Sequence, residues 1–298
     1  MGKNYILRIA KKNQDETLKS CLIHKLLIEK YGDNNEHILK IYEFGVLSPE
    51  KRIYSILERC DGDLFNYIYS INKSVESFID IIYKMTESIK YLHDNNLVHL
   101  DIKLENFLYK NNNGKIEVKI TDFGTAEFEG TVLSMIRGTE TTIAPEFLDE
   151  LKNSRQYIVN KKADIFSLGV CFMIFFIWIF KNIFLDFYSP LSMGIQNRNT
   201  LLNYRQNYYH KPSNKYSFYE NDMSSIVKIL SNINNKLKEI IYSILQKSLA
   251  PVEQRYNINE LLDDIEKLKD INRGSPTSVI GFNSLVGKRK SNNNLSKL

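Results

Sequence analysis

Alternating apolar and polar positions mark the front of the chain as strand-rich. Residues 4–10 (NYILRIA), 37–44 (HILKIYEF) and 53–57 (IYSIL) follow a two-residue period, which predicts three short strands. Between the first two, apolar side chains recur at helical spacing, so we expect a helix over residues 14–31. The front of the chain should therefore form a small sheet accompanied by one helix.

The period changes to that of helices after residue 62. Residues 63–70 and 76–95 have the pattern of amphipathic helices. A small hairpin follows, with strands at 107–108 and 118–120 and the turn Asn112-Asn113-Gly114 between them.

From residue 164 the pattern is helical, apart from an Asn-, Tyr- and Ser-rich stretch at 196–222 that we expect to be a loop. The longest apolar run, Ile165–Phe180, has 16 residues. A bilayer requires about 20 apolar residues, so this run predicts a buried helix and not a membrane span. A strand-rich front followed by a helix-rich back is typical of an α+β fold with two unequal lobes.

The formal net charge of +5 resides at the end of the chain. Residues 272–298 contain five basic side chains and no acidic one, so residues 1–271 are neutral on balance. Nucleic-acid-binding domains are expected to present a basic face, which argues against that class of partner. The Ser- and Asn-rich surroundings of the cluster at 287–290 (GKRK) favour a disordered tail, with a nuclear-import or phosphate-binding patch as the alternative.

The three cysteines, Cys21, Cys60 and Cys171, lack C-x-x-C spacing and form no disulfide framework. This usage favours a reducing compartment. The amino terminus does not have the pattern of a signal peptide. We therefore expect a cytoplasmic location, or a nuclear one if the basic cluster acts in import.

Three short motifs in a fixed order carry the strongest chemical signal. Val98–Asn106 (VHLDIKLEN) is followed by Asp122-Phe123-Gly124 and then by Ala144-Pro145-Glu146. Together they resemble the catalytic loop, the metal-binding triplet and the end of the activation segment of eukaryotic-type protein kinases. The resemblance covers roughly residues 5–270 and implies a two-lobed fold, with a small β-rich amino-terminal lobe and a large helical carboxyl-terminal lobe.

The resemblance gives each polar residue of the motifs a role. Phosphoryl transfer needs positioning and charge neutralisation more than covalent chemistry. Asp101 matches the carboxylate that orients the attacking hydroxyl and accepts its proton, and Lys103 matches the cation near the transferring phosphoryl group. Asn106 and Asp122 match the ligands of Mg²⁺, which prefers oxygen donors. Thr139 matches the threonine that contacts the catalytic carboxylate and lysine in Ser/Thr kinases, which implies a protein substrate.

The resemblance also implies an ATP site. Leu57 would be the gatekeeper, the backbone of Glu58 and Cys60 would bind the adenine edge, and Leu108 would close the pocket from below. Arg8 stands where the family has the strand lysine that contacts the phosphates.

Three regions are implied along the chain: a reduced amino-terminal lobe and hinge at 1–60, a helical catalytic lobe at 61–271 and a basic tail at 272–298.

Other positions agree with the family pattern. Asp164 matches an aspartate that holds the backbone of the catalytic loop, and Arg255 matches an arginine that pairs with the glutamate of Ala-Pro-Glu, here Glu146. Leu100 replaces the arginine that receives an activation-segment phosphate. Phosphorylation of that segment is therefore not expected to be the activating event.

The front of the kinase pattern departs from the family. No G-x-G-x-x-G occurs in the chain, so the sequence is either a truncated part of a longer protein or has a reduced lobe. Arg8 replaces the usual lysine, with Lys11 as an alternative by a three-residue shift, and the planar guanidinium is not equivalent to an ammonium. The acidic partner on the first helix is unclear: the best periodic match is His24, and Glu29 lies one turn further on.

Two hypotheses follow. The complete set of base, lysine, metal ligands and Thr139 favours an active Ser/Thr protein kinase. The missing Gly-rich loop, Arg8 and the unpaired helix favour a pseudokinase, which would act as a binding or scaffolding module.

Overall fold

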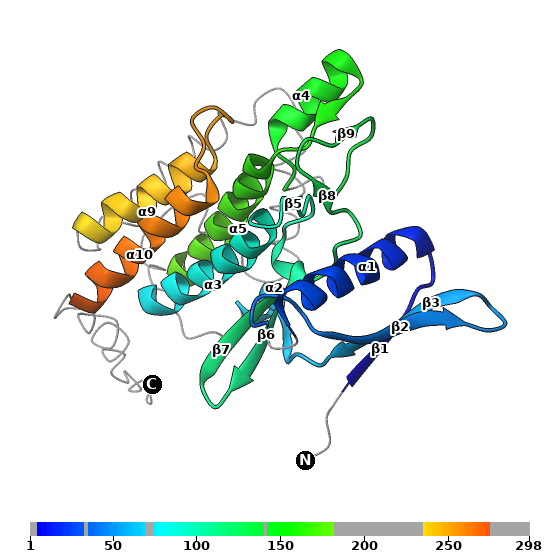
Figure 1. The fold of residues 1–298 in the computed structure, drawn as a ribbon. Coiled ribbons are helices and arrows are strands. Elements are labelled where there is room, and N and C mark those ends of the chain that lie inside the picture. Colours follow the sequence, from blue (N-terminus) through cyan, green and yellow to red (C-terminus); the bar gives the residue numbers. More distant parts are fainter. Residues whose placement is uncertain (1–4, 33–34, 69–73, 140–141, 182–234, 275–298) are drawn as a thin grey trace, which may run out of the picture.

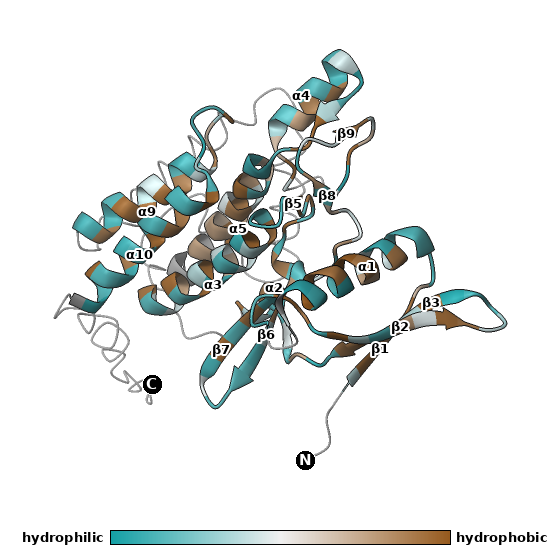
Figure 2. Ribbon diagram, in the orientation of Figure 1, coloured by the Kyte–Doolittle hydropathy of each residue, from teal (hydrophilic) through white to brown (hydrophobic). Residues whose placement is uncertain are grey.

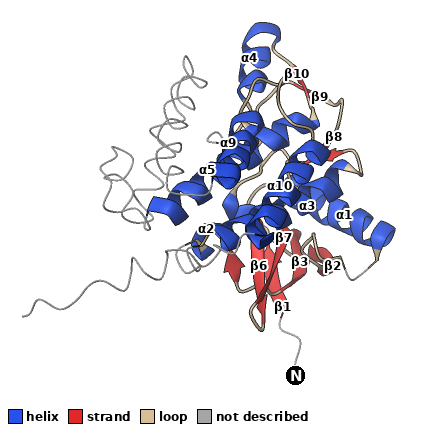
Figure 3. Cartoon of the chain, turned by 90° about the vertical axis from the view of Figure 1, so that its left-hand side faces the viewer, coloured by secondary structure: helices blue, strands red, loops and turns tan. Residues whose placement is uncertain are grey.

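The structure is a computed structural model that describes residues 5–32, 35–68, 74–139, 142–181 and 235–274. Figure 1 shows a small sheet with one helix, α1, beside a larger group of helices. In Figure 3 the longer strands lie together at the lower end of the molecule, and most of the helices lie above them. This is the α+β arrangement that the sequence predicts. The expected loop at 196–222 lies outside the described residues.

The small sheet contains β1 (Tyr5–Ile9), β3 (Arg52–Glu58) and β2 (Ile41–Leu47), in that order and antiparallel. Helix α1 (Gln14–Tyr31) lies along the sheet (Figure 1). The predicted strands and helix are thus confirmed. Their shared apolar core consists of Ala10, Cys21, Leu39, Ile41, Ile53 and Leu57.

The second strand begins later than residue 37, where the alternating pattern starts. The Ile120 amide donates to the His37 carbonyl at 2.8 Å, and the Leu39 amide donates to the Ile120 carbonyl at 3.0 Å. Residues 37–39 therefore contact a second sheet, and bonding to β3 begins at the Lys40 carbonyl, which accepts from the Glu58 amide. Alternation alone cannot tell which partner a strand-like segment will choose.

The predicted hairpin is confirmed and is longer than expected. Strands β6 (Phe107–Asn112) and β7 (Lys115–Ile120) pair in antiparallel fashion, and β4 (Gly62–Asp63) adds to the edge of β6. Asn113 and Gly114 form the turn with positive φ angles of 54° and 92°, as a two-residue type I′ hairpin turn requires. The loop before this hairpin carries most of the candidate catalytic residues.

Helices form the rest of the described molecule. They are α2 (Leu64–Tyr67), α3 (Val75–His93), α4 (Pro145–Ser154), α5 (Lys161–Lys181), α9 (Asn235–Ser248) and α10 (Ile258–Gly274). Between them lie the 3₁₀ turn η1 (Leu104–Asn106) and the short strands β5 (Leu97–Val98), β8 (Glu127–Phe128), β9 (Val132–Leu133) and β10 (Tyr157–Ile158). Helix α10 includes the first three residues of the expected tail at 272–298, and the other residues of that tail lie outside the described residues.

Helix α5 forms the centre of the helical part. It packs against α3 and α9, and α10 packs against α3 and α9 in turn. Its side chains from Ile165 to Phe176 are all buried, and Figure 2 shows its strongly apolar character. The predicted buried helix is confirmed. Among the described helices, none has both the length and the hydropathy that a membrane crossing needs.

Candidate active site

The side chains of Asp101, Lys103 and Thr139 come from two segments of the chain and are hydrogen-bonded to one another. Lys103 Nζ lies 2.7 Å from Asp101 Oδ2, and Thr139 Oγ1 donates to Asp101 Oδ1 at 2.5 Å. Lys103 Nζ also donates to Thr139 Oγ1 at 2.8 Å, which closes a triangle of hydrogen bonds. Charge-assisted bonds of this kind are stronger than neutral ones, so the three groups hold one another in place. The structure therefore brings together the three residues that the sequence nominates as catalytic.

Gly138 allows Thr139 to approach the catalytic loop. Its φ is +89°, and a Cβ at this position would lie 1.9 Å from the Leu100 carbonyl oxygen. Only glycine fits here, because both the backbone conformation and the contact exclude a side chain. The activation segment can thus lie directly on the loop that carries Asp101.

Asp164 stabilises the backbone of the catalytic loop. Its side chain is fully buried at the start of α5. Its carboxylate accepts from the His99 amide at 2.8 Å and the Leu100 amide at 3.0 Å. His93 Nε2 lies 3.0 Å from the same carboxylate. Leu100 has a left-handed backbone, with φ of 64°, and these bonds stabilise it.

The ring of His99 links the loop to the strand before Asp122. Its Nε2 lies 3.0 Å from the Thr121 carbonyl oxygen, and its Nδ1 lies 3.2 Å from the Asp101 amide. A carbonyl only accepts and an amide only donates, so the proton of the neutral ring is on Nε2. The ring thereby fixes the distance between the two acidic residues of the site.

Asn106 and Asp122 have the donor chemistry expected of magnesium ligands. Asn106 Nδ2 donates to the Asp101 carbonyl at 2.7 Å and to Asp101 Oδ2 at 3.1 Å. Both bonds use the amide nitrogen, which leaves the amide oxygen for a cation. The Asp122 side chain is 41% exposed. One amide and one carboxylate oxygen on adjoining loops fit Mg²⁺, which binds few protein oxygens and retains waters.

Asp122 itself has a left-handed backbone, with φ of 67°. Such a conformation costs about 1–3 kcal/mol for a residue other than glycine, so its neighbours must maintain it. The next amide, that of Phe123, donates to Ser20 Oγ at 3.1 Å. The Phe123 ring is fully buried between His24 and His99, with ring centroids 4.5 and 5.5 Å away.

The cation on β1 pairs with the metal-ligand candidate. Arg8 lies 3.7 Å from Asp122 Oδ2, and both side chains are more than 40% exposed, at 44% and 41%. The alternative cation, Lys11, follows the end of β1 and is exposed.

Neither residue proposed as the helix partner forms an ion pair with Arg8. His24 is buried and bonds to the Ser20 carbonyl, and Glu29 pairs with Lys25 at 3.6 Å on the exposed side of α1. Burial lowers the pKa of His24 to about 3, so the ring is neutral at physiological pH. Ser20 was not predicted, because a single hydroxyl on a helix gives no periodic signal.

The expected adenine-site residues gather at the end of β3. Leu57, Cys60 and Leu108 belong to the same small apolar cluster. The Glu58 amide is already bonded to the Lys40 carbonyl at 2.9 Å, so this amide is not available to a ligand. Burial, followed by the charge of Glu58, raises the pKa of the Cys60 thiol to about 11.

The Glu58 side chain has a second role that the sequence did not indicate. Its carboxylate pairs with Lys119 Nζ at 2.9 Å and Lys110 Nζ at 3.0 Å. Burial alone would raise the pKa of Glu58, but the bonds from Lys119 and Lys110 outweigh it and lower the pKa. The two lysines come from β7 and β6, so this cluster ties the end of the small sheet to the hairpin.

The predicted pair of Glu146 and Arg255 is present. The Arg255 guanidinium donates to both Glu146 oxygens, at 2.6 and 3.0 Å, and its side chain has no exposed surface. It also donates to the carbonyls of Ala250 and Lys162, each at 2.9 Å. This fixes α4, and with it the end of the activation segment, against the helices.

Comparison with known proteins agrees with this arrangement. A family model described as a protein kinase domain matches residues 2–264. The chain belongs to the protein kinase family.

Two proteins to which the chain is similar are named as serine/threonine-protein kinases. A probable serine/threonine-protein kinase of Dictyostelium discoideum is 29% identical over 246 residues, covering 79% of this chain and 19% of the relative. The serine/threonine-protein kinase DCLK1 of Rattus norvegicus is 32% identical over 172 residues, covering 57% of this chain and 38% of the relative. The matches thus span well under half of these relatives.

A solved structure has the same fold. The kinase PK-1 of Cydia pomonella granulovirus aligns with a TM-score of 0.57 and 19% identity, covering 89% of this chain and 86% of that one. This likeness concerns the fold alone and confirms the expected kinase architecture.

Proposed function

We propose that this kinase-family chain transfers the γ-phosphate of ATP to Ser or Thr hydroxyls of a protein substrate. The observation that carries the proposal is the triangle of Asp101, Lys103 and Thr139, with bonds of 2.5 to 2.8 Å. Asp101 would orient the incoming hydroxyl and accept its proton, and Lys103 would offset charge on the transferring group. The contact of Thr139 supports Ser/Thr specificity.

The nucleotide would lie between the end of β3 and the loop of Asp122. Leu57, Cys60 and Leu108 would contact adenine, with the Glu58 carbonyl and Cys60 amide at its polar edge, and Arg8 would bind phosphate. Asn106 and Asp122 would hold Mg²⁺, which neutralises phosphate charge when bound. The regions 1–60, 61–271 and 272–298 would then be the nucleotide lobe with hinge, the catalytic lobe and a tail. None of the three cysteines, all within the described residues, forms a disulfide, which supports a reducing, cytoplasmic location.

A pseudokinase remains the second candidate, supported by one contact. Arg8 pairs with Asp122 and not with an acid on α1, so the cation that should bind phosphate lies against the metal-ligand candidate. A protein of this kind would bind nucleotide or partners without efficient turnover.

Replacement of the candidate base tests the proposal. Asp101→Asn should lower phosphate transfer to a generic Ser/Thr substrate by about 10²–10⁴-fold and leave ATP affinity nearly unchanged. The matched control is Asp94→Asn, an aspartate that is 55% exposed at the end of α3. Transfer assays and a thermal shift with Mg²⁺–ATP measure the two effects. Transfer by Asp101→Asn at the parental rate would refute the assignment, and a shift without any transfer by the parent would favour the pseudokinase.

A further inference from the structure

Helix α1 contacts the segment that begins with Asp122 through its backbone and one buried hydroxyl. Ser20 is 3% exposed, and its Oγ accepts from the Phe123 amide at 3.1 Å. One turn earlier, the Glu16 carbonyl lies so close to Gly124 that a Cβ there would be 3.1 Å away. The helix therefore lies directly on the two residues that follow Asp122.

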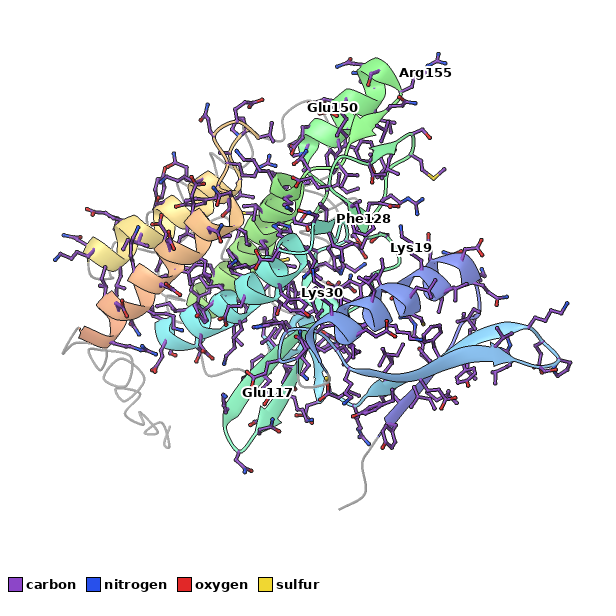
Figure 4. All side chains as sticks on the ribbon, viewed as in Figure 1. Lys19, Lys30, Glu117, Phe128, Glu150 and Arg155 are labelled. Atoms are coloured by element: carbon purple, nitrogen blue, oxygen red, sulfur yellow. The ribbon has the colours of Figure 1, made fainter. Side chains whose placement is uncertain are left out.

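An ion pair extends this contact to strand β8. Lys19 Nζ lies 2.6 Å from Glu127 Oε1, with the side chains 32% and 18% exposed. The two residues are 108 positions apart, so the pair joins two elements instead of stabilising one. Figure 4 shows Lys19 on the side of α1 that faces the segment carrying Phe128.

These contacts stabilise the backbone of Asp122, which has an unfavourable conformation. Its φ of 67° is one that a residue other than glycine adopts only when the surroundings impose it. The Phe123 amide belongs to the peptide plane directly after Asp122. A hydrogen bond that fixes this plane also restricts ψ of Asp122, and with φ it sets the direction of the Cα–Cβ bond from which the carboxylate extends.

We propose that Ser20 and Lys19 are positioning residues for the metal-bound nucleotide. They hold the backbone of Asp122 in the conformation from which its carboxylate binds Mg²⁺. Helix α1 would thus act on the site through a hydroxyl and an ion pair to β8, without an acid directed at Arg8. The inference rests on the proposed function, because it takes Mg²⁺–ATP as the ligand.

The first test removes the hydroxyl with Ser20→Ala. In the metal-free protein, hydrogen exchange at the Phe123 amide should accelerate, because its acceptor is lost. The Mg²⁺ concentration for half-maximal ATP binding should rise about fivefold, as expected for one lost hydrogen bond. The matched control is Ser88→Ala, another fully buried helical serine, whose hydroxyl bonds to the Lys84 carbonyl at 3.0 Å. The control should leave both readouts unchanged.

The second test reverses the ion pair. Lys19→Glu and Glu127→Lys should each raise the Mg²⁺ midpoint, and the double variant should restore it toward the parental value. The control is Lys161→Glu, which breaks the neighbouring pair with Glu129 at 3.0 Å and should not move the midpoint; Lys161 is 26% exposed, close to the 32% of Lys19.

An unchanged midpoint and Phe123 exchange in Ser20→Ala, or a double variant without rescue, would overturn the inference and leave the proposed function standing. A parent protein that shows no Mg²⁺-dependent ATP binding would overturn the proposed function, and the inference with it.

Discussion

Residues near the candidate base have left-handed backbone conformations, and these conformations are maintained in two ways. Leu100 and Asp122, with φ of 64° and 67°, carry side chains and rely on hydrogen bonds. The Leu100 amide donates to the Asp164 carboxylate, and the amide that follows Asp122, that of Phe123, donates to Ser20 Oγ. Gly138, with φ of 89°, relies on its lack of a side chain. The site is thus built from backbone shape as much as from functional groups.

Gly138→Ala should be severe, because the new Cβ would lie 1.9 Å from a backbone oxygen. We expect a loss of more than about 2 kcal/mol in unfolding free energy, since neither φ nor space suits alanine. Phosphate transfer should fall with it, because Thr139 must move. Urea denaturation and a transfer assay measure both effects.

Gly130→Ala tests the penalty of the backbone conformation alone, without the steric clash that accompanies it in Gly138→Ala. Gly130 has a similar φ of 86°, and among the described residues beyond its two chain neighbours none lies within 4 Å of the added Cβ. The unfolding free energy of Gly130→Ala should fall by only about 1 kcal/mol, the usual penalty for alanine in a left-handed conformation. Phosphate transfer should be retained. Equal losses in the two variants would show that the contact with Leu100 is unimportant.

The sequence predicted the motif residues of the site better than their supports. Asp101, Lys103 and Thr139 were nominated from the spacing of motifs and lie together as expected. The sequence gives Ser20 no role and matches His24 only to the helix partner of Arg8, because the side of α1 that meets the activation segment depends on tertiary packing. A hydroxyl and a neutral imidazole also give no charge pattern to follow.

At the scale of elements, Arg255 connects helices whose contacts with one another local sequence patterns do not predict. It donates to Glu146 on α4, to the carbonyl of Lys162 on α5 and to that of Ala250 after α9. Its guanidinium also lies 5.0 Å from the ring centre of Phe166. The sequence predicted the pair with Glu146, but burial and the two carbonyl contacts depend on the arrangement of three helices.

Arg255→Met should destabilise the protein by about 3–5 kcal/mol, because it leaves Glu146 without its buried partner. Arg255→Lys should recover only part of the loss, since an ammonium cannot bond to both carboxylate oxygens in a fork. Denaturant titration measures both.

The control for Arg255 is Lys267→Met on α10, which breaks a pair with Asp264 in which Lys267 is 64% exposed. Surface pairs contribute about 0–1 kcal/mol, so little change is expected. If Arg255→Met lost no more than this control, the junction would not stabilise the helical lobe.

At the scale of the whole molecule, the end of β3 leads from the small sheet into the helical part. Glu58 lies at this point and pairs with Lys119 on β7 and Lys110 on β6. The sequence identified the hinge from the residues around Glu58, but both lysines are more than fifty positions away, at 61 and 52. A contact at that separation gives no local pattern, so the side-chain role was missed.

The two lysines should differ in their effect on stability. Lys119 is 9% exposed and Lys110 is 37% exposed. Lys119→Met should lower the unfolding free energy by about 2–3 kcal/mol at pH 7, whereas Lys110→Met should lower it by about 1 kcal/mol or less. Methionine retains most of the apolar stem, so the comparison isolates the charge.

The loss in Lys119→Met should also depend on pH. The lysines lower the pKa of Glu58 below its usual 4.5, so their stabilisation is present above that value and is lost as pH falls through the lowered pKa. The difference in unfolding free energy between parent and Lys119→Met should therefore shrink as the pH falls below 4.5, through the range in which Glu58 becomes protonated. Denaturant titrations across this range measure it. A difference that stayed constant would mean that Lys119 stabilises the junction through packing, because only the charged form of Glu58 attracts the ammonium.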